Sequence, residues 1–173
     1  KFTINLNEKA KNKKIDPVFG RDKELKKMTS ILLRRRKNNV VILGEPGVGK
    51  TALAEDLALK IVNNTSHEEL FDKTLLLLDL VSMMSGTQER GALEKNITGF
   101  LKEIEGRDDI ILMIDEIHML NASSNVGGNK DGGNLNVANI LKPGLARGDI
   151  KCIGATTYSE YVKYFSTDIF LLR

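Results

Sequence analysis

Short runs of apolar residues alternate along the chain with longer segments in which apolar residues recur at helical spacing. The runs have the length of strands, and the longer segments have the period of an amphipathic helix. The predicted strands are Asn39–Leu43, Leu75–Leu78, Ile110–Ile114 and Lys151–Thr156. The predicted helices are Arg21–Arg36, a segment from Ala52 to about Val62, Gly91–Glu105 and Asn136–Leu145. Because strands and helices alternate, we expect an α/β fold with a mainly parallel sheet covered by helices.

Two polar segments fall outside this alternation. Lys1–Lys14 is rich in Lys and Asn, and Asp16-Pro17 breaks the chain after it, so we predict an arm or linker over residues 1–15. Asn121–Asn134 is rich in Gly, Asn and Ser and is predicted to be a mobile loop. The remaining residues, 16–173, are enough for one domain with a sizeable core.

A glycine-rich motif follows the first of these strands. It reads Gly44-Glu45-Pro46-Gly47-Val48-Gly49-Lys50-Thr51, the G-x-x-x-x-G-K-T pattern. Glycines allow successive backbone N–H groups to converge on an anion, and the helix that follows adds its N-terminal donors. In such a motif the lysine reaches the β- and γ-phosphates and the threonine hydroxyl ligates Mg²⁺. The motif therefore predicts a site for a nucleoside triphosphate with Mg²⁺.

Two acidic residues follow the continuous apolar run Ile110–Ile114, which is typical of a central parallel strand. Ligands of open α/β sheets bind at the carboxyl ends of such strands, so we expect Asp115 and Glu116 beside the phosphate loop. Asp115 is predicted to join Thr51 in the Mg²⁺ shell, held through water. Glu116 is predicted to polarise the attacking water, the step that distinguishes hydrolysis from binding.

Composition and charge narrow the choice of partners. The chain has 26 Lys and Arg residues against 23 Asp and Glu residues, a net charge of +3, which does not favour nucleic acid. We interpret Arg34–Lys37 as basic residues that complement a helix C-terminus. No apolar run approaches the roughly 20 residues that cross a bilayer, so no membrane is expected. The single cysteine, Cys152, favours a reducing compartment and is predicted to be buried.

Six segments occur in an order that resembles one family. They are Asp16–Arg21, Arg34–Asn39, Gly44–Thr51, Asp115–His118, Leu141–Gly148 and Gly154–Thr157. Together they resemble the first nucleotide-binding domain of Clp-type AAA+ chaperones, the ClpA, ClpB and ClpC group. The resemblance covers residues 16–173 and implies the large subdomain of a P-loop NTPase, a three-layer sandwich that ends before the small helical subdomain. It also implies that the isolated fragment binds and hydrolyses ATP poorly.

The resemblance assigns further residues and partners. Val18 and Phe19 would lie against the adenine, Thr157 would be the sensor of the γ-phosphate and water, and Arg173 would act on ATP of the neighbouring subunit. The family forms hexameric rings that hydrolyse ATP to ADP to unfold or disaggregate client polypeptides. Some members deliver these polypeptides to a Clp protease. A soluble intracellular location is implied, in the bacterial cytosol or in the matrix of a plastid or mitochondrion.

One position departs from the family, and two other functions stay open. Glu89 stands where the family's pore loop carries a tyrosine, and a hydrated carboxylate lacks the apolar grip of an aromatic ring. One alternative is therefore a non-motor AAA+ subunit that binds ATP as an assembly scaffold, although Glu116 favours hydrolysis. The other is a nucleic-acid helicase, because Asp115–His118 spells D-E-x-H. The ordered segments and the near-neutral charge argue against a helicase.

Overall fold

The computed structural model describes residues 2–85, 90–119, 143–145 and 147–165 of the chain. In these residues the strands are β1 (Thr3–Asn5), β2 (Val40–Leu43), β3 (Thr74–Leu78), β4 (Ile110–Ile114) and β5 (Lys151–Thr156). The helices are α1 (Leu6–Lys11), α2 (Asp22–Leu32), α3 (Lys50–Val62), the short 3-10 helix η1 (Glu68–Leu70), α4 (Leu80–Ser85), α5 (Arg90–Ile104) and α8 (Tyr158–Phe165). The predicted strands are confirmed. Most of the predicted helix Asn136–Leu145 and the predicted loop Asn121–Asn134 lie outside the described residues.

The strands form one sheet in the order β1-β3-β4-β5-β2. Strands β3, β4, β5 and β2 are parallel, and β1 pairs antiparallel with β3 at the edge. The register places Leu112 of β4 between Leu76 and Cys152 on its two neighbours. Because the four parallel strands run the same way, the segments that follow Leu43, Ile114 and Thr156 all leave the sheet at the edge formed by the carboxyl ends of these strands, not at the outer strand β1. This edge carries the site described below.

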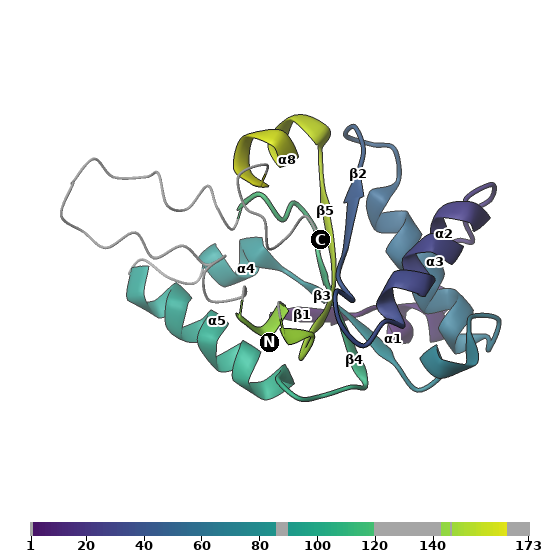
Figure 1. Cartoon of the computed structure of the whole chain (residues 1–173), viewed down its shortest axis with the longest axis horizontal. Coiled ribbons are helices and arrows are strands. Elements are labelled where there is room, and N and C mark those ends of the chain that lie inside the picture. Colours follow the sequence, from purple (N-terminus) through teal and green to yellow (C-terminus); the bar gives the residue numbers. More distant parts are fainter. Residues whose placement is uncertain (1, 86–89, 120–142, 146, 166–173) are drawn as a thin grey trace.

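Helices cover both faces of the sheet, as the three-layer sandwich requires (Figure 1). Alternate residues of β4 point to opposite faces: Ile111 and Met113 belong to the core shared with α1, α2 and α3. Leu112 and Ile114 belong to the core shared with α4 and α5. All five residues of β4 are buried, which explains the continuous apolar run. Among the described residues, no helix is both long enough and apolar enough to cross a membrane.

The segment predicted as an arm or linker instead forms β1, which is a strand of the sheet, and α1, which packs against β3 and α3. Leu6 is fully buried, and Ala10 is 5 % exposed. The side-chain amide of Asn7 donates to the Lys73 carbonyl and accepts from the Leu75 N–H, each at 2.9 Å. The side-chain amide of Asn7 donates and accepts as a backbone peptide group would. A Lys- and Asn-rich composition does not indicate such a buried contact. Whether a domain boundary falls at residue 15 stays a prediction.

The helix predicted over Arg21–Arg36 is shorter than expected. Helix α2 ends at Leu32, and its last turn contains no basic residue. Residues 34–37 lie beyond it as an exposed bend, and Lys37 has a positive φ of 53°. The basic run therefore does not form the helix C-terminus that we inferred for it.

Candidate functional site

The phosphate loop connects β2 to α3 and is shaped by its glycines. Gly47 and Gly49 have φ angles of 79° and 88°, a region that side chains with a Cβ rarely adopt. A Cβ on Gly44 would lie 2.7 Å from Cγ2 of Val48, so the loop closes tightly on itself there. Helix α3 begins at Lys50, and the first turn of a helix leaves N–H groups without intrahelical partners. The loop therefore offers an anion a cradle of backbone donors.

Lys50 lies inside this loop. Its side-chain amino group donates to the Gly44 carbonyl at 2.9 Å and to the Glu45 carbonyl at 3.1 Å, and the residue is only 8 % exposed. Both of these acceptors are neutral carbonyls, so neither compensates the charge that an anionic ligand would meet. The residues predicted to cradle the phosphates, Glu45 to Gly49, are themselves exposed, so the loop is open to a ligand.

Thr51 and Asp115 are brought together as the sequence predicts. The Thr51 hydroxyl donates to Oδ2 of Asp115 at 2.5 Å. The other carboxylate oxygen of Asp115 accepts the N–H of Glu116 at 3.0 Å. Hydroxyl and carboxylate oxygens are the ligands that Mg²⁺ prefers, commonly with water in the remaining positions. The donor set therefore fits Mg²⁺, although the ligand roles themselves stay predictions.

Glu116 directly follows Asp115 and has an unusual backbone. Its φ is 50°, a conformation that costs a residue other than glycine roughly 1–3 kcal/mol and that concentrates at functional sites. Half of its side-chain surface is exposed, so the carboxylate has access to water. Oε2 of Glu116 lies 3.4 Å from Nδ1 of His118.

Thr157 is the N-terminal cap of α8 and shares a capping box with Glu160. The Thr157 hydroxyl accepts the N–H of Glu160 at 3.3 Å, and Oε2 of Glu160 accepts the N–H of Thr157 at 3.2 Å. Thr157 itself is 8 % exposed. In this structure its hydroxyl also donates to Oε2 of Glu160 at 2.8 Å. The sensor role of Thr157 stays a prediction.

His118 and Glu160 are site residues that sequence reasoning missed. Oε2 of Glu160 lies 3.1 Å from Nδ1 of His118, and His118 is also in contact with Glu116. One atom from each of these three side chains lies within 4.8 Å of the other two. The T-x-x-E spacing of Thr157 and Glu160 was a readable signal of the capping box. Nothing in the sequence indicated that His118 would join it.

The segment predicted to contact the adenine is tethered near the phosphate loop. Arg21 donates from Nη2 to the Val48 carbonyl at 3.3 Å, and the Val18 N–H lies 3.4 Å from Oδ1 of the buried Asp56. Phe19 is 88 % exposed. The adenine contact stays a prediction for Val18 and Phe19. Arg173 and Glu89 lie outside the described residues.

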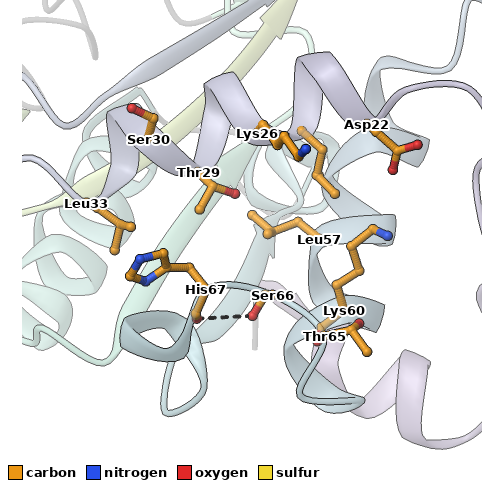
Figure 2. A pocket seen from close by; sticks show the side chains of 11 residues that line it. Asp22, Lys26, Thr29, Ser30, Leu33, Leu57, Lys60, Thr65, Ser66 and His67 are labelled. Carbon is orange, nitrogen blue, oxygen red and sulfur yellow. Dashed lines mark hydrogen bonds between the residues drawn. The ribbon is translucent and has the colours of Figure 1, made fainter.

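A cavity of about 570 Å³ lies away from this site, between α2, α3 and the loop before η1. Figure 2 shows Thr29 of α2 and Leu33, the residue after α2, opposite Leu57 and Lys60 of α3, with His67 at one end. No residue of the phosphate loop and neither residue of the acidic pair lines it. The predicted triphosphate site thus lies at the carboxyl ends of the strands, and the cavity is a separate feature.

Comparison with known proteins is consistent with this geometry. The ATPase family associated with various cellular activities (AAA) matches residues 40–164. The chaperone protein ClpB of Aquifex aeolicus is 46 % identical over 173 residues, all of this chain and 17 % of that protein. The ATP-dependent Clp protease ATP-binding subunit ClpA homolog of Cyanidium caldarium is 46 % identical over 172 residues, 99 % of this chain and 20 % of that protein. The chain thus spans less than a quarter of the length of these curated relatives.

A solved structure is similar to this chain in both fold and sequence. The closed-state cryo-EM reconstruction of Hsp104 with ATPγS and FITC-casein matches at a TM-score of 0.81 and 41 % identity. The match covers 98 % of this chain and 28 % of that chain. At this identity the likeness extends beyond the fold to the sequence.

Proposed function

Because this chain belongs to the AAA family of ATPases, we propose that it is the ATP-hydrolysing part of a Clp-type, ring-forming chaperone that remodels proteins. The observation that carries the proposal is the hydrogen bond between Thr51 and Asp115. It joins the phosphate loop to the acidic pair at the same edge of the sheet, which is the arrangement that ATP hydrolysis with Mg²⁺ needs.

Each predicted residue then has a role at that edge. Pro46 has no N–H, so the backbone donors to the β- and γ-phosphates are the N–H groups of the other residues from Glu45 to Thr51, together with the charge of Lys50. Val18 and Phe19 contact the adenine. Glu116 takes a proton from the attacking water. Thr157 orients this water, and Arg173 acts on the ATP of a neighbouring subunit. Mg²⁺ beside Thr51 and Asp115 would neutralise charge on the phosphate oxygens.

The whole protein is proposed to work as a homo-hexameric ring on client polypeptides. Support comes from relatives whose names describe chaperones or a subunit of the Clp protease, and from an Hsp104 structure that contains casein. A protease partner is proposed on the same basis. The location, bacterial cytosol or organelle matrix, stays a prediction.

The experiment that tests the proposal replaces Glu116 by Gln in the full-length protein. Because a general base contributes about 10²- to 10⁴-fold, we expect steady-state ATP hydrolysis to fall by that factor while ATP binding persists. The variant should therefore accumulate ATP-bound rings that retain a labelled client during gel filtration.

Glu103→Gln is the matched control, because Glu103 is an exposed glutamate on α5. It should hydrolyse ATP at the wild-type rate. Wild-type hydrolysis by the Glu116 variant would show that Glu116 is not the base. Salt-sensitive binding of RNA or DNA would instead favour a helicase.

A further inference from the structure

His118 lies between two carboxylates and has a single nitrogen directed at both. Nδ1 is 3.1 Å from Oε2 of Glu160 and 3.4 Å from Oε2 of Glu116. The hydroxyl of Thr156 lies 3.2 Å from the same nitrogen. The ring itself is well covered, since 15 % of its side-chain surface is exposed.

The two carboxylates compete for this nitrogen. A ring nitrogen carries at most one proton, and a short, straight hydrogen bond uses that proton for one acceptor. The shorter distance favours Glu160. Glu160 is also the less exposed of the two, with 31 % of its side-chain surface exposed against 50 % for Glu116.

Glu160 is held in place by the start of α8. Its Oε2 accepts from the Thr157 hydroxyl at 2.8 Å and from the Thr156 hydroxyl at 3.1 Å. The N–H of Thr157 donates to the same oxygen. Burial raises the pKa of Glu160, but these hydrogen bonds and the nearby His118 outweigh burial and lower it overall. Glu160 therefore remains an ionised acceptor at neutral pH.

We propose that Glu160 is a positioning residue for Glu116: it engages His118 and so leaves the Glu116 carboxylate to act on water. The inference rests on the proposed role of Glu116 as the base. In the tautomer that carries its proton on Nδ1, His118 without Glu160 donates that proton to Glu116. A carboxylate that accepts a hydrogen bond from an imidazole is directed toward the ring and away from water. In this arrangement His118 would bind the Glu116 carboxylate, and Glu160 prevents this by accepting the hydrogen bond of His118 itself.

The test measures ATP hydrolysis by four forms of the full-length protein: wild type, E160Q, H118A and the double variant. Glutamine preserves the capping box, since S/T-x-x-Q also caps a helix, but it is a weaker acceptor for His118. We expect E160Q to lower kcat roughly 10-fold, the lower end of what a displaced supporting group costs. The KM for ATP should change less than about twofold, because nothing in the phosphate loop is altered.

The decisive result is rescue by a second substitution. Because Glu160 acts through His118, adding H118A to E160Q should restore the kcat of H118A alone. A residue that only stabilises α8 would give losses that add instead. E160A, which removes the cap and the acceptor together, should be slower than E160Q and should also be accelerated by H118A.

A control and two contrary outcomes complete the design. N5A removes the N-terminal cap of α1, where Asn5 accepts from the Glu8 N–H, and should leave kcat unchanged. If E116Q is inactive, two results overturn the inference and leave the proposed function standing. One is a wild-type kcat for both E160Q and E160A. The other is a double variant as slow as E160Q. A wild-type rate for E116Q overturns the proposed function, and the inference falls with it.

Discussion

Among single residues, Cys152 shows how burial determines chemistry. The side chain is 2 % exposed on β5, and burial raises the pKa of its thiol to about 12. At pH 8 the thiolate is then roughly 10⁻⁴ of the native population, and the thiolate is the form that reacts. The predicted buried core position of Cys152 is thereby confirmed.

We expect the native chain to resist alkylation at Cys152. Iodoacetamide at pH 8, followed by mass spectrometry, should label the native protein slowly and only through opening of the structure. The same chain in urea should label at the rate of an ordinary thiol, because its pKa returns to the usual range. Equal rates in the two states would show that Cys152 is accessible in the native fold.

The site residues divide by the kind of signal that each one leaves. Lys50, Thr51 and Asp115 belong to motifs whose spacing and strand context specify where they meet, so their arrangement was predictable. His118 and Glu160 meet because β4 and β5 are neighbours, and no local pattern encodes a pairing between two loops. The positive φ of Glu116 is likewise set by the chain around it.

At the scale of elements, β1 and α1 show the limit of reading composition. Strand β1 pairs with β3, with Ile4 opposite Leu77, and α1 covers the core face beside it. Three residues are too few for alternation to be recognised as a strand, and a six-residue helix leaves hardly two turns. The longer α3 and α5 were predicted to within a residue or two because their periodicity is sustained.

This packing predicts a large effect for Leu6→Ala. Leu6 is fully buried, so the substitution should lower the free energy of unfolding of the chain by about 2–5 kcal/mol. Ile4→Ala is the matched control, since Ile4 is 42 % exposed and should cost far less. Urea unfolding followed by circular dichroism measures both. Equal, small losses would indicate that residues 3–11 are an arm after all.

On the scale of the whole molecule, one edge of the sheet gathers residues that are distant in sequence. The loops after β2, β4 and β5 carry Lys50, Asp115 and Thr157, and the Gly44 N–H donates to the Thr156 carbonyl at 3.2 Å to join the first loop to the last. This convergence followed from the predicted parallel order. A ligand that contacts all three loops must therefore stabilise the fold as a unit.

ATP with Mg²⁺ should accordingly raise the stability of the chain. Ligand at 100 times its Kd adds about 2.7 kcal/mol to the free energy of unfolding, so the thermal midpoint should rise as ATP is titrated. Lys50→Ala should abolish the rise, whereas Lys95→Ala, an exposed position on α5, should leave it intact. EDTA should reduce the rise, because Thr51 and Asp115 then have no cation to share with the phosphates. An undiminished rise in Lys50→Ala would place the nucleotide elsewhere, and the cavity between α2 and α3 would be the site to test next.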